Sequence, residues 1–265
     1  MEPRKKLISR KQLRESFRNT ILNKEIAPHG VVLVDLEDYC LQTRKRAEAR
    51  EQAAKVIQSA FRNDPGIWWM AVGKAPDSEE GQQQVADFLS FLSEWEVLLS
   101  SRKGIVLLSV NAETQEIIGV CCVLSPHSEE SYIDFVIALL TIKSRFWGFR
   151  SMQQRRAEAF GAWQKESRKR AYEGGMPIFL SMLGVRPDWH GRGIGKAMLQ
   201  ALNFISDDLK TPIYLETSLA KNVEIYKKSG YRILENLKRP VQVSVGNCRE
   251  HFDMLTPMLR LPTTQ

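Results

Sequence analysis

The sequence predicts a mixed α/β (α+β) chain in which helices flank a central sheet. Three observations predict this class: apolar residues recur at helical spacing early in the chain, a pair of strand-like segments follows, and strand-like and helix-like segments alternate after residue 177. The chain has 265 residues, 43% of them hydrophobic, and is therefore long enough to bury a core of its own.

The first half predicts two helices followed by a hairpin. Apolar residues recur every three or four positions in residues 44–62, which end at an Asn-Asp-Pro-Gly turn, and again in residues 82–99. Residues 104–110 and 116–124 have strand-like apolar patterns and are joined by a short polar turn. This arrangement predicts two antiparallel strands.

The second half predicts two further helices and then three strands separated by helices. Residues 131–172 have helical periodicity interrupted near Gly148. The segments that follow are predicted, in order, as a strand at 178–185, a helix at 196–209, a strand from 213, a helix at 222–229 and a strand at 231–234. The strand 178–185 is apolar on both faces apart from Ser181, as expected of a central strand that is covered on both sides.

The net charge of +7 is distributed unevenly along the chain. Residues 1–30 contain eight Lys/Arg and three Glu, and residues 143–170 contain nine Lys/Arg and two Glu, so the remainder is acidic. No recognised nucleic-acid motif accompanies the basic segments, which favours a solvated helix face and a loose tail over a nucleic-acid partner. We therefore expect residues 1–30 to be a flexible basic tail and residues 31–265 to form a single domain.

The cysteines and the apolar segments predict a cytoplasmic protein. Four cysteines are too few for a disulfide scaffold, and none has zinc-ligand spacing. Cys121 and Cys122 are adjacent in an apolar segment, which predicts core side chains on opposite faces of a strand. The longest apolar stretch, residues 132–142, is about half of the roughly 20 residues that a membrane span needs.

A glycine-rich loop follows the predicted central strand. Residues 185–197 have the sequence VRPDWHGRGIGKA, and such a loop exposes backbone N–H groups at a helix N-terminus, as a pyrophosphate requires. A Rossmann fingerprint fails because Lys196 or Met198 stands where its last glycine or alanine belongs. A P-loop fails because His190 and Ala197 occupy two of its fixed positions. A turn with glycines for packing alone remains the alternative.

The loop resembles the acyl-CoA pyrophosphate loop of the GNAT superfamily of N-acetyltransferases. Residues 185–187 (Val-Arg-Pro) match the end of that family's strand, and Gly193 and Gly195 match its two small positions. His190 stands where the family usually has Gln or Arg, a departure that puts one loop or phosphate contact in doubt.

A second part of the chain is similar to the same family. Residues 212–218, the helix from Asn222 to Tyr226, and the pair at 230–231 resemble the family's next strand, its N-x-x-x-Y helix and its glycine-aromatic turn. Residues 215–218, Leu-Glu-Thr-Ser, are similar to the branch that includes puromycin N-acetyltransferase. The resemblance is best over residues 176–235 and extends in element order from about residue 44.

The resemblance implies a fold, a cosubstrate and a reaction. The fold is a mostly antiparallel sheet with one parallel, splayed strand pair, and the reaction is transfer of an acetyl group from acetyl-CoA to a primary amine by direct attack, without a metal. The residues implied in binding the coenzyme are Leu183, Gly184, Val185, His190, Gly191, Arg192, Gly193, Ile194, Gly195, Lys196 and Asn222. The family places a backbone N–H of its fourth strand on the thioester carbonyl.

Two side chains are candidates for proton transfer. Tyr226 is the candidate general acid, since a phenol of ordinary pKa about 10 can donate to a thiolate. It could also be a packing residue, and Asn222 could be only a helix N-cap. The strand 178–185 contains no carboxylate, so Glu216 on the next strand is the candidate base, directly or through water. A structural role for Glu216 remains equally open.

The remaining expectations concern the acceptor and the partners. The segment 127–175 is longer than the corresponding link in minimal family members and could form a substrate lid, a dimer contact or a membrane-surface patch, in that order. We expect a small-molecule amine as acceptor, and a monomer or a homodimer. The alternatives are a non-catalytic acyl-CoA-binding module, an enzyme acting on protein amines, and a nucleic-acid-binding protein.

Overall fold

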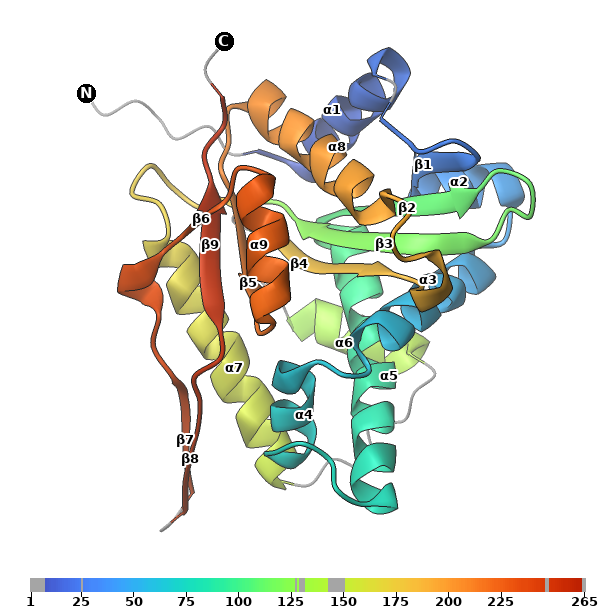
Figure 1. Cartoon of the computed structure of the whole chain (residues 1–265). Helices are drawn as coiled ribbons and strands as arrows, with labels where there is room; N and C mark the ends of the chain where they lie inside the picture. Colours follow the sequence, from blue (N-terminus) through green and yellow to red (C-terminus); the bar gives the residue numbers. More distant parts are fainter. Residues whose placement is uncertain are drawn as a thin grey trace.

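A computed structural model describes residues 8–24, 26–126, 128, 132–142, 151–245 and 248–263 (Figure 1). The helices in these residues are α1 (Arg10–Asn23), α2 (Leu36–Thr43), α3 (Arg46–Phe61), α4 (Pro65–Val72), α5 (Glu79–Lys103), α6 (Tyr132–Thr141), α7 (Ser151–Arg170), α8 (Ile194–Leu209) and α9 (Ala220–Lys228). The strands are β1 (Val31–Asp35), β2 (Gly104–Asn111), β3 (Ile117–Leu124), β4 (Ile178–Val185), β5 (Ile213–Thr217), β6 (Arg232–Ile233), β7 (Val241–Val245), β8 (Cys248–Phe252) and β9 (Thr256–Arg260).

Seven strands form the main sheet in the order β1-β2-β3-β4-β5-β9-β6, and β7 and β8 form a separate hairpin. Every neighbouring pair of the main sheet is antiparallel except β4 and β5, which are parallel. That parallel pairing joins only Ile178 to Ile213 and Phe179 to Tyr214, so the two strands separate beyond Phe179. The predicted fold class, a mostly antiparallel sheet with one parallel pair, is confirmed.

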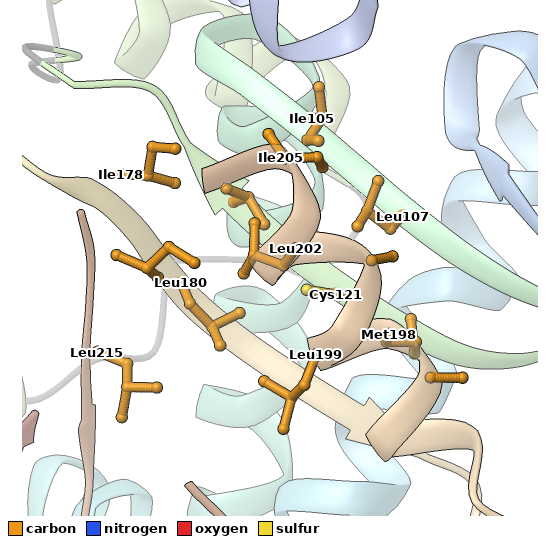
Figure 2. Close-up of a cluster of buried hydrophobic side chains, with 14 of the residues drawn as sticks. Ile105, Leu107, Cys121, Ile178, Leu180, Met198, Leu199, Leu202, Ile205 and Leu215 are labelled. Carbon is orange, nitrogen blue, oxygen red and sulfur yellow. The ribbon is translucent and has the colours of Figure 1, made fainter. Parts of the chain in front are cut away.

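Helices cover both faces of the sheet. α1 and α8 pack on one face, and α3 and α5 pack on the other (Figure 1). Cys121 points toward α8, among Leu180, Met198 and Leu202, whereas Cys122 belongs to the cluster that contains α3 (Figure 2). The two cysteines are therefore core residues on opposite faces of β3, as their alternation along a strand predicts.

The turn after the first predicted helix has a second role. It ends α3 as predicted, and it also begins α4, because the Asp64 carboxylate accepts hydrogen bonds from the N–H groups of Gly66 and Ile67 at 2.8 and 3.2 Å. Pro65 fits the first helical position, where its missing N–H costs nothing.

The prediction of a flexible basic tail is wrong for the described residues 8–24. Ser9 and Gln12 form a capping box that starts α1. Leu13 and Phe17 are buried at 0% and 1% exposure in the core cluster that also contains α8. These apolar positions have helical spacing, but they are separated by charged residues. The folded domain therefore begins before residue 31.

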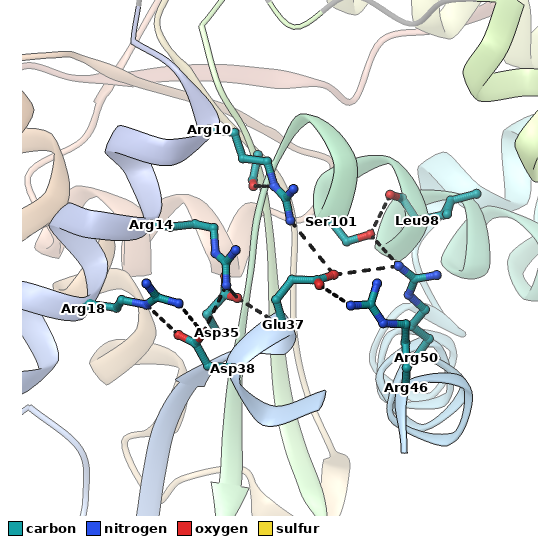
Figure 3. Close-up of polar contacts among 11 residues, drawn as sticks. Arg10, Arg14, Arg18, Asp35, Glu37, Asp38, Arg46, Arg50, Leu98 and Ser101 are labelled. Carbon is teal, nitrogen blue, oxygen red and sulfur yellow. Dashed lines mark hydrogen bonds and ion pairs between the residues drawn. The ribbon is translucent and has the colours of Figure 1, made fainter. Parts of the chain in front are cut away.

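The basic side chains of α1 are held by acidic residues at the start of α2 (Figure 3). Arg14 lies 3.1 Å from both Asp35 and Asp38, and Arg18 donates from Nε to Asp38 at 2.9 Å. Asp35 is also the N-cap of α2. Much of the positive charge near the N-terminus is thus neutralised within the fold.

The predicted helical segment after β3 contains α6 and α7, and the predicted break at Gly148 lies outside the described residues. The buried Asp134 ties α6 to the end of α5 through Arg102 at 2.9 Å and Lys103 at 3.1 Å. Among the described residues, no helix has both the length and the apolar character that a membrane span requires.

Candidate active site

The separation of β4 from β5 exposes one edge of β4. The N–H of Arg186 donates to the carbonyl of Ile118 on β3 at 2.9 Å, and the register of the two strands continues from this pair. Backbone N–H and C=O groups alternate in direction along an antiparallel strand. Those of Gly184 therefore point toward β3, whereas those of Leu183 and Val185 point toward the gap beside β5. The gap thus receives backbone groups from two of the three predicted β4 residues.

Gly184 is required for packing. A Cβ at this position would lie 2.9 Å from the Cβ of Ala60 on α3, which is closer than two carbon atoms can approach. The strand register also shifts between Cys122 and Val123, which marks a bulge at Ser181. The Ser181 hydroxyl donates to the Cys122 carbonyl at 3.1 Å. The polar side chain of β4 is therefore engaged with the neighbouring strand.

The glycine-rich loop between β4 and α8 presents open backbone. Gly191 and Gly193 have a φ of 78°, in the left-handed region that favours glycine. The bond that begins α8 runs from the Ala197 N–H to the Gly193 carbonyl, so the amides of residues 194–196 precede it. Such amides lie at the positive end of a helix and suit a phosphate group.

Gly195 has neither a positive φ nor a crowded position. A Cβ there would meet only Val185 Cγ2, at the ordinary contact distance of 3.8 Å. The surrounding protein therefore does not require glycine, whereas a ligand lying against the helix end would.

Side chains of the loop hold its conformation. His190 Nε2 lies 2.9 Å from the carbonyl oxygen of Val185, which ties the loop to the end of β4. The guanidinium of Arg192 lies over the Trp189 ring at 4.4 Å. The family's Gln or Arg is thus replaced by a histidine that contacts the chain itself.

A cavity of about 760 Å³ lies beside the gap, between α4, α5 and α7 on one side and β4, β5 and α9 on the other. Its wall includes four of the predicted site residues, Leu183, Glu216, Asn222 and Tyr226. The predicted loop residues 190–196 are outside that wall. The predicted residues therefore form two neighbouring parts, a cavity and a loop, which β4 connects.

Tyr226 lies in the wall of this cavity at 9% exposure. Its ring contacts Tyr231 edge to face, with 5.7 Å between the ring centroids. Burial raises the pKa of Tyr226 above its usual value, so the phenol keeps its proton at neutral pH. Asn222 is not the N-cap of α9, since Leu219 holds that position.

Glu216 is half-buried in the same wall. Gln164 on α7 donates from Nε2 to Glu216 Oε2 at 2.7 Å, and Glu216 Oε1 has no hydrogen-bond partner among the described residues. Burial raises the pKa of Glu216 to about 7, although Gln164 and Arg168 favour the charged form. A carboxyl group of this pKa can gain or lose a proton near neutral pH.

Two further carboxylates in the wall come from the first half of the chain. Asp64 accepts a hydrogen bond from the Ser218 hydroxyl at 2.6 Å, and Glu96 extends from α5. Burial raises the pKa of Asp64. In the sequence, Asp64 stands only in a predicted turn and Glu96 only within a predicted helix, because their approach to β5 and β4 depends on tertiary packing. A helix N-cap motif was the available signal at Asp64.

α7 directs its basic residues away from the cavity with two exceptions. Arg155, Lys169 and Arg170 are exposed and outside the wall. Lys165 belongs to the wall although it is exposed, and the buried Arg168 belongs to the wall and lies over the Phe179 ring at 4.9 Å. Part of the segment 127–175 therefore borders the cavity.

Comparisons with known proteins match this fold. Residues 151–233 match the family model described as the acetyltransferase (GNAT) domain. The histone acetyltransferase HPA2 and related acetyltransferase from Corynebacterium glutamicum is 15% identical, with 90% of this chain and 99% of that chain covered and a TM-score of 0.50.

Two more solved structures share the fold. The C-terminal condensation domain of Ebony, in complex with beta-alanyl-dopamine, is 14% identical, covering 87% of this chain and 98% of that chain with a TM-score of 0.52. Arylalkylamine N-acetyltransferase 2 from Aedes aegypti is 10% identical, covering 89% of this chain and 100% of that chain with a TM-score of 0.50. Residues 151–233 are therefore similar to the GNAT acetyltransferase domain, and the chain shares its overall fold with these three structures.

Proposed function

We propose that the chain is an acetyl-CoA-dependent N-acetyltransferase that acetylates the primary amine of a small molecule. One observation carries this proposal: a single cavity joins the open edge of β4, a tyrosine that keeps its proton, and a carboxyl group whose pKa is about 7. These are a donor site, a general acid and a general base, which acyl transfer from a thioester to an amine requires.

The residues of β4 and of the loop that follows it suit the binding of the coenzyme. The amides of residues 194–196, with the open space at Gly195, suit the pyrophosphate. The outward backbone groups of Leu183 and the N–H of Val185 suit the arm that carries the thioester, in the place that a further strand would take beside β4. The Val185 carbonyl is already in contact with His190. Asn222 lies in the cavity wall beside this path.

Each step then uses a group of this chain. Glu216, directly or through water, accepts a proton from the bound ammonium, and the neutral amine nitrogen forms a bond to the thioester carbon. The N–H of Leu183 stabilises the negative charge that develops on the carbonyl oxygen. As the carbon–sulfur bond breaks, the Tyr226 hydroxyl gives its proton to the departing thiolate, which leaves as the free thiol of coenzyme A. The second proton of the amine nitrogen then passes to the Tyr226 phenolate, directly or through water, so that a neutral amide and a protonated tyrosine remain.

The geometry favours an enzyme over a non-catalytic acyl-CoA-binding module. The module was an alternative because of His190 and because β4 lacks a carboxylate. His190 contacts the Val185 carbonyl, which leaves the helix amides open, and Asp64, Glu96 and Glu216 supply carboxylates from other elements. The test is release of free thiol from acetyl-CoA across a panel of primary amines. Binding of acetyl-CoA without thiol release from any amine would support the module instead.

A small-molecule acceptor is favoured over a protein amine because α5 and α7 enclose the cavity beside β4. The structures of similar fold include one named for arylalkylamines and one holding beta-alanyl-dopamine, which are small amines.

Replacing Gly195 with Leu is expected to raise the Kd for acetyl-CoA at least tenfold. The new side chain would enter the space that the pyrophosphate requires, while the protein offers no clash at Cβ. Isothermal titration calorimetry measures the Kd, and thermal unfolding shows that the fold is kept. Gln200→Leu, at an exposed position of the same helix, is the control and should bind acetyl-CoA as the unchanged protein does. Equal Kd values for both variants would exclude the loop as the coenzyme site.

The pH dependence of turnover is expected to follow Glu216. The base must be deprotonated, so kcat/KM should rise as pH increases through about 7, the pKa of this carboxyl group. Glu216→Gln should remove that rise and lower kcat/KM at pH 8 by about a hundredfold. Glu224→Gln, an exposed change on α9, should keep the profile. An unchanged profile in Glu216→Gln would show that another group is the base.

A further inference from the structure

The cavity extends beyond the reacting groups into a space that is lined mainly by aromatic and aliphatic side chains. We name this part the acceptor chamber, and it is defined by the last residue of α3, by α4, α5 and α7, and by the strand residue that faces them. Its apolar residues are Phe61, Ile67, Met70, Phe88, Phe91, Leu92, Trp95, Phe160 and Phe179. α4 and α5 lie outside the residues that match the GNAT family model. Most of the chamber residues therefore lie outside the matched part of the chain, whereas Phe160 and Phe179 lie inside it.

Several of these rings are only partly covered by the protein. Phe91, Trp95 and Phe160 are half-buried, and all three belong to the cavity wall. An apolar ligand that covers such aromatic surface removes it from water, which favours binding. A cavity of about 760 Å³ is of the size that holds a compact organic ligand.

Charged side chains of both signs line the cavity, and two of its carboxylates lie near the sheet. Asp64 and Glu216 lie at the β5 side, and Asp64 is close enough to Tyr226 to affect its titration electrostatically. Lys103 and Arg168 belong to the same wall, and Arg168 is buried. Lys103 is paired with Asp134 at 3.1 Å, and Glu96 and Glu158 also belong to the wall, so it is the apolar chamber that disfavours a second charge on the acceptor.

Resting on the proposed function, we propose that the acceptor is a primary amine with a single positive charge on an aromatic or other apolar body. The amine lies between Asp64, Glu216 and Tyr226, and the apolar body fills the acceptor chamber. Polyamines and polyhydroxylated amines fit poorly, because their additional polar groups would lie against the aromatic and aliphatic side chains of the chamber.

Gly161 on α7 allows the chamber to be narrowed without disturbing the fold. It belongs to the cavity wall, it is exposed to solvent, and a Cβ there would have no atom within 4 Å. A glycine inside a helix lowers stability, so Gly161→Leu should leave the protein at least as stable. Arg155→Leu places the same side chain on the exposed side of α7, outside the wall, and is the matched control.

The experiment compares 2-phenylethylamine, propylamine and spermidine as acceptors. The unchanged protein should acetylate 2-phenylethylamine with a kcat/KM at least tenfold above that for the other two. Gly161→Leu should lower this value about tenfold while the value for propylamine changes less than twofold, and Arg155→Leu should change neither. Equal or better use of spermidine, or an equal loss for all amines in Gly161→Leu, would overturn the proposal.

Binding without chemistry separates this inference from the proposed function. Calorimetry of 2-phenylethylamine with the protein and no acetyl-CoA reports the chamber alone. If no amine is acetylated, the proposed function fails, and binding that Gly161→Leu weakens still supports the chamber. Absence of 2-phenylethylamine binding, or equal Kd values for Gly161→Leu and the unchanged protein, would overturn the chamber assignment.

Discussion

Tyr226→Phe is expected to lower kcat by about a hundredfold or more while the Kd for acetyl-CoA changes less than about threefold. Loss of a positioned general acid costs from about a hundredfold to ten-thousandfold in rate. The buried phenol keeps its proton at neutral pH and lies in the cavity wall beside the open edge of β4. Removal of one oxygen leaves the ring contact with Tyr231 in place. Steady-state kinetics and calorimetry measure the two quantities.

Tyr231→Phe is the matched control for this change. Tyr231 is the other ring of the same pair, is 3% exposed, and lies outside the cavity wall. Its hydroxyl donates to Asn203 Oδ1 at 3.3 Å, so its loss should cost about 1 kcal/mol of stability and leave kcat unchanged. If Tyr226→Phe also kept its kcat, the tyrosine would be a packing residue, and another group would protonate the thiolate.

The parts of the fold that the sequence predicts well are those with local signals. The strand 178–185 has the predicted bounds, because an unbroken apolar segment ends at Pro187 and a glycine loop. The helix after the loop begins two residues earlier than predicted, at Ile194, since Gly193 is its N-cap. The hairpin and both early helices are present for the same reason: each pattern is complete within a short segment.

The parts that the sequence did not predict depend on distant partners. β9 lies between β5 and β6 in the sheet although it is the last of the described strands along the chain. β1 pairs with β2 although four helices, α2 to α5, lie between them in the chain. The same applies to the site. Glu216 follows from its place in a local motif, but its partner Gln164 and the carboxylate of Asp64 meet it only after folding.

Phe17→Ala is expected to lower the free energy of unfolding by about 3 to 5 kcal/mol, the usual cost of removing a fully buried aromatic side chain. Phe17 is 1% exposed in the cluster that joins α1 to α8 and the sheet. Urea unfolding followed by circular dichroism measures the change. If residues 1–30 formed a flexible basic tail, Phe17→Ala would leave the free energy of unfolding unchanged. The variant therefore distinguishes a flexible tail from a helix packed against the core.

Two controls on α1 separate apolar packing from charge. Lys11→Ala, at a side chain that is 84% exposed, should change the free energy of unfolding by less than about 0.5 kcal/mol. Arg18→Ala removes an ion pair with Asp38, but the arginine side chain is 48% exposed, and such pairs contribute at most about 1 kcal/mol. Burial of Leu13 and Phe17 should therefore contribute more to the free energy of unfolding than the ion pairs of α1 do. A larger loss in Arg18→Ala than in Phe17→Ala would mean that the ion pairs hold α1 in place.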